Sequence, residues 1–143
     1  MSNAGAIWKS KQLSHGGFPL LIRYPDTAFT NAEKSMFPNL ALIVHEFSTV
    51  SSNGLPDADY NDELLQFDND IRSTFERSET GQTVLVETFG GKRRYYVYVA
   101  AQTDVEELLS QVRRANPKEN LSWTIHPDPD WDFLKKYHEQ YFV

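Results

Sequence analysis

Two adjacent glycines, Gly90 and Gly91, interrupt a run of strand-forming residues between positions 83 and 100. Two-residue loops of this kind are typical of tight β-hairpins, because glycine adopts the positive φ angles that such turns need. A two-residue turn here places Phe89 opposite Lys92. It also fixes every further pair of the hairpin, since a shift of one residue would move each side chain to the other face of the sheet.

This register divides the hairpin into two faces. The first face is largely aliphatic, and we expect it to lie beneath the core helices; it carries Val84, Val86, Tyr95, Val97 and Val99. The second face is aromatic and partly charged; it carries Leu85, Glu87, Phe89, Arg94, Tyr96 and Tyr98. A buried tyrosine removes about 150–250 Å² from water, so an open second face would expose a large apolar patch. We therefore expect a cover, for which the candidates are the C-terminal helix, the N-terminal hairpin and a second subunit.

The elements around this hairpin follow the order strand, helix, strand, strand, helix and strand. An apolar run at Leu40–Val44 predicts a strand that is buried on both faces. Apolar residues recur at helical spacing after Asp57 and again after Thr103, which forms a capping box with Glu106. Alternation between residues 121 and 125 predicts the last strand. This order is the split βαβ pattern of the ferredoxin-like α+β fold, an antiparallel sheet whose two helices share one face.

Three further features complete the predicted fold. The first core helix carries an apolar stripe that we expect in the core: Tyr60, Leu64, Phe67, Ile71 and Phe75. An added N-terminal β-hairpin is predicted from residues 8–13 and 19–24, which flank the turn His15-Gly16-Gly17. An added C-terminal helix is predicted to begin at Asp128-Pro129 and to present aromatic residues on one side.

The length of 143 residues fits one domain. We interpret residues 1–4 as a cloning remnant and assign residues 5–143 to a single α+β domain. The chain has no cysteine, which excludes disulfides and thiolate metal sites. No apolar run approaches the roughly 20 residues of a membrane span, and we expect no signal peptide before the fold. We therefore expect a cytoplasmic protein without a membrane association or a cofactor.

The net charge of −6 is concentrated in one segment. Residues 57–79 hold eight acidic and two basic side chains, and the rest of the chain is balanced. Such a helix face commonly serves solubility alone, but it is also the one surface with a marked charge. Our leading hypothesis is a non-enzymatic interaction or regulatory module that binds a basic protein partner through Asp59, Asp62, Glu63 and Asp70. An acidic domain is a poor candidate for binding nucleic acid, because phosphate contacts draw their affinity from clustered Lys and Arg.

The alternative hypothesis uses the second face of the sheet. Basic residues followed by tyrosines at positions 91–99 partially match the aromatic RNA-binding strand of RRM domains. A small molecule or an RNA would then bind through Arg94, Tyr96 and Tyr98. Packing of the same tyrosines in a core explains the pattern as well.

Catalytic and metal-binding motifs are incomplete. The acids at positions 57–68 lack the glycine and the bidentate glutamate of a calcium loop. His126, Asp128, Asp130 and His138 could approach a metal, but Asp-Pro before a helix is ordinary capping, which we favour. We interpret His45, within a buried strand, as a core residue. Because no nucleophile–base pair is recognisable, the sequence favours a non-enzymatic role, and a catalytic pair assembled only in three dimensions stays open.

Several of these features together resemble a known family. They are Gly54-Leu55-Pro56 before an acidic helix, the hairpin with its Gly-Gly turn and tyrosine-rich second strand, Asp128-Pro129-Asp130-Trp131, Trp8, and the strand that ends at Arg23. In these features the chain resembles the bacterial domain-of-unknown-function family 695. That family is distantly similar to the regulator of ribonuclease E activity B, a ferredoxin-like protein inhibitor. The resemblance implies the same fold and a protein-binding role, and it brings no catalytic residues.

Overall fold

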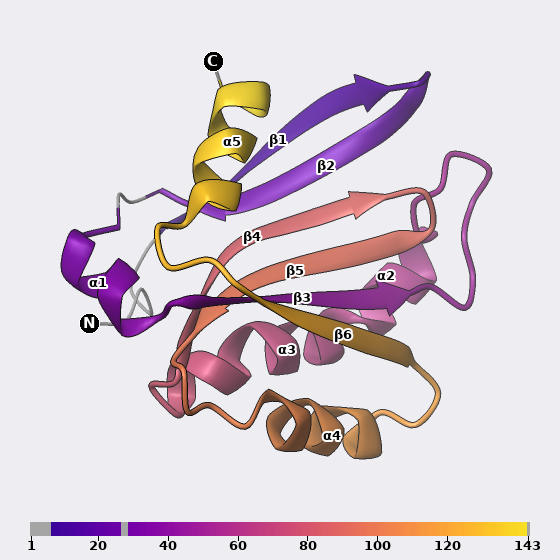
Figure 1. The fold of residues 1–143 in the computed structure, drawn as a ribbon. Coiled ribbons are helices and arrows are strands. Elements are labelled where there is room, and N and C mark those ends of the chain that lie inside the picture. The colour runs from indigo at the N-terminus through magenta and orange to yellow at the C-terminus, as the bar shows by residue number, and fades with distance from the viewer. Residues whose placement is uncertain (1–6, 27–28, 143) are drawn as a thin grey trace.

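The computed structural model describes residues 7–26 and 29–142 (Figure 1), so the predicted cloning remnant lies outside the described residues. Six strands form one antiparallel sheet in the spatial order β1-β2-β4-β5-β3-β6. The strands are β1 (Trp8–His15), β2 (Phe18–Pro25), β3 (Asn39–Glu46), β4 (Gly81–Phe89), β5 (Lys92–Val99) and β6 (Asn120–Pro127). The helices are α1 (Asn31–Met36), α2 (Ala58–Glu63), α3 (Leu65–Arg77), α4 (Val105–Ala115) and α5 (Asp132–Tyr141).

The hairpin of β4 and β5 has the predicted register over most of its length. Phe89 pairs with Lys92 at the turn, and the further pairs follow in step as far as Leu85. The register then shifts between Thr83 and Leu85, where a β-bulge occurs at Val84. The prediction that Val84 faces the helices is therefore wrong, because the bulge turns it to the opposite face, where it joins the second core.

The first core lies between the sheet and the helices α3 and α4, which share one face of the sheet as predicted (Figure 1). Ile71 and Phe75 of α3 are completely buried there. The capping residue of α4 is Asp104, whose carboxylate accepts a hydrogen bond from the backbone N–H of Glu107. The predicted capping box at Thr103 is therefore one residue too early.

The single helix predicted after Asp57 is divided into α2 and α3, which meet at Leu64. The Asp57 carboxylate caps α2 by accepting a hydrogen bond from the backbone N–H of Tyr60. The backbone N–H of Leu64 bonds to the carbonyls of both Tyr60 and Asn61, which tightens the chain at the junction. The apolar stripe continues across this junction, so all of its five members reach the first core.

The second face of the sheet is covered by α5 (Figure 1). Trp131, just before α5, is buried; its ring stacks on Tyr98 at a centroid distance of 4.1 Å and its indole N–H donates to the carbonyl of Phe37. The N-terminal hairpin forms as predicted, but it extends the sheet beside β4. Of the three candidate covers, the C-terminal helix is thus the one observed.

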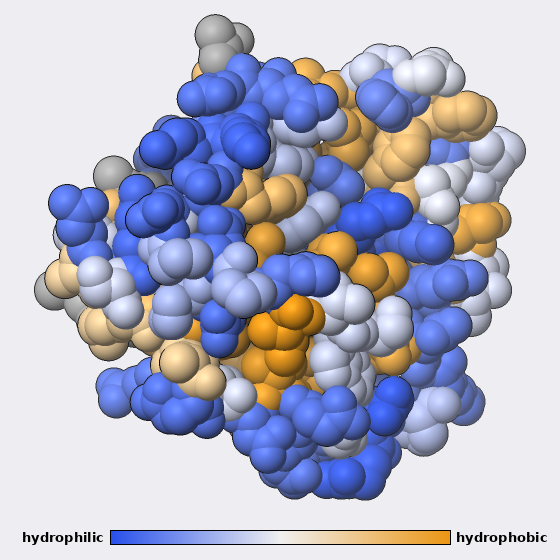
Figure 2. Space-filling model, in the orientation of Figure 1, coloured by the Kyte–Doolittle hydropathy of each residue, from blue (hydrophilic) through white to orange (hydrophobic). Residues whose placement is uncertain are grey.

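The cover leaves part of this face accessible. Leu42 and Val44 of β3 are only half-buried. Figure 2 shows apolar side chains over β3 and β6 on this side, with hydrophilic side chains over α4 and α5. Among the helices of residues 7–26 and 29–142, none has the length and apolar composition needed to cross a membrane.

Candidate functional site

A buried carboxylate surrounded by three arginines is the most unusual polar feature of the domain. Asp68 lies on α3, and its side chain is only 7% exposed. Arg23 of β2 holds it with both terminal nitrogens, at 2.7 Å and 3.1 Å. Arg72, one turn along α3, donates through Nε at 3.0 Å, and the Tyr95 hydroxyl of β5 donates at 2.6 Å. We call Arg23, Asp68, Arg72, Arg93 and Tyr95 the Asp68 cluster.

The cluster follows from the alternation of side chains along the strands. On β2, Leu20 and Ile22 face the second core, so Arg23 points to the other side, toward α3. On β5, Arg93 and Tyr95 likewise face α3, and Arg94 between them faces α5. Asp68 joins three chain segments, and it therefore ties the N-terminal hairpin to the core helix.

The electrostatics of the cluster favour an ionised Asp68. Burial alone would raise the pKa of Asp68, but the hydrogen bonds and charge of Arg23, with Tyr95 and Arg93, hold this pKa far below its ordinary value. Burial beside the carboxylate raises the pKa of the Tyr95 hydroxyl well above its usual value, so the tyrosine stays neutral and its O–H donates a hydrogen bond to Asp68.

Arg93 is held differently from the other two arginines. Its Nη1 is 3.5 Å from Asp68, which is a long contact. Its Nε donates to the hydroxyl of Thr88 at 2.9 Å, and its Nη2 donates to the Asn61 side-chain oxygen at 3.4 Å. The guanidinium lies over the ring of Phe47 and its side chain is 10% exposed. Neutral groups and a shared carboxylate therefore surround this nearly buried charge.

A cleft of about 310 Å³ opens beside Arg23 and Arg93, between the N-terminal hairpin and the start of α3. Its polar lining comes from both strands and helices, and its apolar lining is leucine. The lining residues are Ser10, Lys11, Gln12, Leu21, Arg23, Asn61, Leu64, Leu65, Asp68, Thr88 and Arg93. The volume lies at the lower end of the range that small-molecule sites occupy.

The predicted acidic surface is only partly assembled as expected. Asp59, Asp62 and Glu63 are exposed on α2. Asp70 is half-buried on α3, where it accepts a hydrogen bond from Gln66. Asp68, which the sequence places in the same acidic segment, is withdrawn from this surface into the Asp68 cluster.

The alternative ligand face is occupied by α5. Tyr98 is fully buried, and its hydroxyl donates to Asp128 at 2.7 Å. Tyr96 stacks on Phe133 at a centroid distance of 4.6 Å. These two rings are therefore packed in a core, which leaves neither of them open for stacking on a base.

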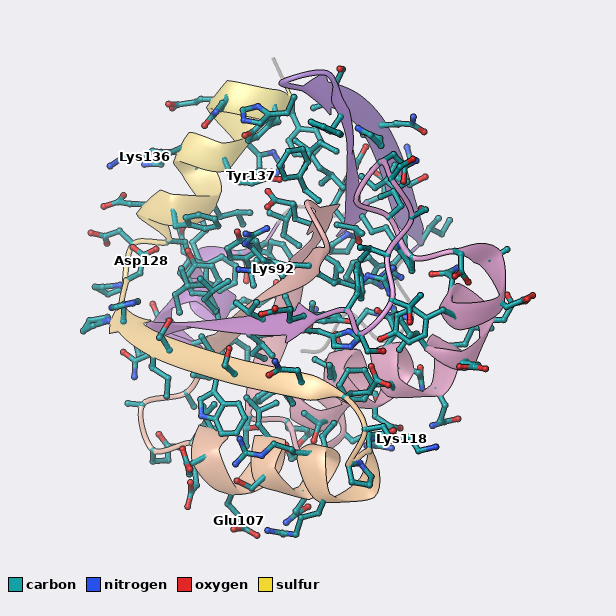
Figure 3. The ribbon with its side chains drawn as sticks, turned by 90° about the vertical axis from the view of Figure 1, so that its right-hand side faces the viewer. Lys92, Glu107, Lys118, Asp128, Lys136 and Tyr137 are labelled. Carbon is teal, nitrogen blue, oxygen red and sulfur yellow. The ribbon has the colours of Figure 1, made fainter. Side chains whose placement is uncertain are left out.

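The remaining residue of that face, Arg94, lies in a small polar network below α5. It contacts Glu87 at 3.5 Å, and Glu87 also accepts a hydrogen bond from the Tyr137 hydroxyl at 2.7 Å. Figure 3 shows Tyr137 pointing from α5 toward the sheet, whereas the neighbouring Lys136 points away from it.

Of the candidate metal ligands, Asp128 serves the fold. The Asp128 carboxylate accepts backbone hydrogen bonds from Asp132 and Phe133 in the first turn of α5, which is the capping role that we favoured. The helix itself begins at Asp132, so the prediction that it begins at Asp128-Pro129 is wrong. In the described part of the chain, no three His, Asp or Glu side chains lie close enough to hold a metal ion.

His45 is buried as expected, and its Nε2 is 2.8 Å from Glu119. Burial lowers the pKa of His45, which is consistent with a neutral core residue.

Sequence reasoning missed the Asp68 cluster although one signal was present. Asp68 follows Leu64 by four residues and precedes Ile71 by three, so it occupies a position on the buried stripe of the helix. A carboxylate on a buried stripe needs a cation beside it. The identity of that cation depends on which strand of the N-terminal hairpin pairs with β4, which the sequence alone does not specify.

Comparison with known proteins adds a family and no activity. A family model described as a family of unknown function, DUF695, matches residues 7–138. No curated protein matches the chain. The matched residues include every member of the Asp68 cluster and every lining residue of the cleft.

Proposed function

The chain belongs to the DUF695 family of unknown function, and we propose from the geometry of the Asp68 cluster that it is a non-enzymatic module that binds an anionic ligand. The main observation in support of this proposal is that Arg23 and Arg93 line one cleft and share the carboxylate of Asp68. Two guanidinium charges with one counter-charge leave a binding position for a further anion. Arginine suits this task because its planar fork matches carboxylate and phosphate groups.

A binding role fits the chemistry of the lining better than a catalytic one. Asp68 already accepts hydrogen bonds from two arginines and a tyrosine, and its pKa is held far below neutrality. It is therefore a poor proton acceptor at physiological pH. Lys11 also belongs to the lining, but its side chain points to the other face of the sheet, where its Nζ donates to the backbone carbonyl of Tyr141. The remaining polar groups of the lining are amides, hydroxyls and guanidiniums, which orient a ligand.

We also assign the part of the chain from β3 to β6 to the ferredoxin-like fold. The sheet order β4-β5-β3-β6, with α3 and α4 on one face, supports this assignment. The distant similarity to the regulator of ribonuclease E activity B, the bacterial origin and the cytoplasmic location stay predictions.

The anion-binding proposal predicts opposite results for two neighbouring arginines. Arg93→Met removes the guanidinium that faces the cleft, whereas Arg94→Met removes one that faces α5. At constant ionic strength, acetate or inorganic phosphate should produce saturable shifts of the cleft amide signals in NMR spectra. We expect Arg93→Met to weaken this binding by roughly 10- to 100-fold, the value of a hydrogen bond to a charged group. We expect Arg94→Met to bind like the wild type.

The outcome of this comparison is decisive for the site. Equal binding by both variants and the wild type would refute the proposal, as would shifts that increase linearly without saturation. Circular dichroism of each variant establishes that the folded protein is being compared.

A second candidate function is the predicted one, in which the domain binds a basic protein partner. The observation that favours it is the exposure of three carboxylates on α2, Asp59, Asp62 and Glu63, none of which forms an ion pair within the described residues. Unpaired surface charges of one sign accelerate the encounter with a partner of the opposite sign.

This second function predicts a salt-sensitive interaction. A partner captured at low salt should dissociate as the screening length falls from about 10 Å toward 3 Å. Reversal of Asp62, Glu63 and Asp70 to lysine should abolish capture while the circular dichroism spectrum stays that of the wild type. A partner that survives both high salt and the triple reversal would exclude this surface.

A further inference from the structure

We infer, resting on the proposed anion-binding function, that the ligand of the cleft is a carboxylate that carries a short aliphatic group. Three properties of the cleft lead to this ligand class: its charge, its leucine lining and its size. A free aliphatic acid and the C-terminus of a peptide share this chemistry.

The charge of the cleft matches one negative charge. Arg23 and Arg93 share Asp68, which leaves one positive charge without its own partner. The Lys11 ammonium does not add to this charge, because it lies on the α5 side of the sheet, at the Tyr141 carbonyl and over the Phe142 ring. Arg72 adds a third guanidinium to the cluster, but it also interacts with Glu76 on the next turn of α3. A carboxylate restores neutrality, whereas the dianion of a phosphate monoester would bring a surplus negative charge into a site whose existing carboxylate is buried.

The leucine side of the cleft indicates an aliphatic substituent. Leu21, Leu64 and Leu65 line the cavity beside the arginines. Leu65 is 64% exposed, which makes it one of the most exposed large apolar residues of the described chain. A ligand that reaches from Arg93 to Leu65 would remove this side chain from water, which is favourable in proportion to the apolar area covered.

The size of the cleft limits the length of the substituent. A cavity of about 310 Å³ is small for a ligand site. Ser10 and Gln12 line its hairpin side with polar groups, so only part of its wall is apolar. A short aliphatic chain fits this space, whereas a long acyl chain would leave the cleft and lie in solvent.

Calorimetric titrations with four probes test the ligand class at constant ionic strength. The probes are hexanoate, acetate, hexanol and inorganic phosphate. We expect hexanoate to bind about tenfold or more tightly than acetate, because each methylene that becomes buried contributes about fourfold. Hexanol, which has the tail without the charge, should bind at least tenfold more weakly than hexanoate.

The same titrations separate this inference from the proposed function. If phosphate binds more tightly than hexanoate, or if acetate binds as tightly as hexanoate, the aliphatic carboxylate is wrong and anion binding stands. If none of the anions binds, both are wrong.

One variant and its matched control locate the binding. Asn61→Asp places a carboxylate beside Arg93, at the position from which the Asn61 oxygen now accepts at 3.4 Å. This built-in anion should reduce hexanoate affinity at least tenfold without loss of thermal stability, since it neutralises Arg93 in place of the ligand. Asn69→Asp makes the same change at an exposed site of α3 and should leave affinity unchanged. Unchanged hexanoate binding by Asn61→Asp would overturn the inference.

The leucine contact and the source of the carboxylate have their own readouts. Leu65→Ser should weaken hexanoate binding several-fold and leave acetate binding unchanged, and an equal effect on both acids would contradict the inference.

The dipeptide acetyl-glycyl-leucine, tested as free acid and as amide, distinguishes a small acid from a peptide C-terminus as the source of the carboxylate. Tighter binding of the free acid than of hexanoate identifies a peptide C-terminus, and weaker binding identifies a small acid. Equal binding of the acid and the amide would overturn the carboxylate.

Discussion

Replacement of Asp68 by asparagine is expected to destabilise the domain by about 3–5 kcal/mol at neutral pH, the usual loss when one partner of a buried ion pair is removed. The variant leaves Arg23, Arg72 and Arg93 close together without their common counter-charge. The asparagine amide group would in addition face the donors that now bond to a carboxylate oxygen. Urea unfolding followed by circular dichroism measures the loss.

A matched control lies two residues along the same helix. Asp70→Asn makes the same chemical change at a half-buried residue whose carboxylate accepts from Gln66. We expect the free energy of unfolding of this variant to stay within about 0.5 kcal/mol of the wild type, as is usual for surface substitutions. Equal, small losses from both variants would show that Asp68 is not the electrostatic centre of the cluster.

The loss should depend on pH in a defined direction. The folded-state pKa of Asp68 is lowered from its ordinary value of 3.8, so its stabilising contribution is complete above about pH 5 and declines as the pH falls below 4. The difference between wild type and Asp68→Asn should therefore be largest at neutral pH and shrink toward pH 2. His45 is present in both proteins, and Asp68 has the smallest of the effects on its pKa, so His45 contributes nearly equally to both curves. A difference that grows on acidification would contradict the assigned direction.

The main elements of this fold could be predicted because local patterns encode them. Gly90-Gly91 fixes the register of β4 and β5, and the burial of Ile71 and Phe75 follows from helical spacing alone. The bulge at Val84 could not be predicted, because Val84 and its neighbours all favour a β-strand. No local pattern therefore indicates which residue of the strand is the unpaired one.

The candidate site was harder to predict than the fold because its members come from distant parts of the chain. Arg23 meets Asp68 only because β2 pairs with β4, a contact that the hairpin pattern does not specify. The local charge count instead assigns Asp68 to an exposed acidic face. The tyrosines of β5 illustrate the opposite error, since the aromatic pattern resembles a binding face and the residues that cover it lie at the other end of the sequence.

The second large effect is expected from the apolar side of the same helix. Phe75→Ala should reduce the free energy of unfolding by about 3–5 kcal/mol, as is typical when a buried phenylalanine is truncated. Phe75 is completely buried between α3 and the sheet. Its environment is also tightly filled, because a Cβ atom built on Gly81 would lie only 3.2 Å from the Phe75 Cβ. The surrounding backbone therefore has little freedom to close the cavity that the ring leaves.

The comparison with an exposed phenylalanine separates cavity formation from the loss of a ring as such. Phe18, at the turn of the N-terminal hairpin, is 49% exposed, and Phe18→Ala should change the free energy of unfolding by no more than about 0.5 kcal/mol. Denaturant melts of both variants give the two values directly. A loss below about 1 kcal/mol for Phe75→Ala would mean that α3 presents a different face to the sheet. The assignment of Asp68 to a buried position on that helix would then fail as well, because both residues are placed by the same helical stripe.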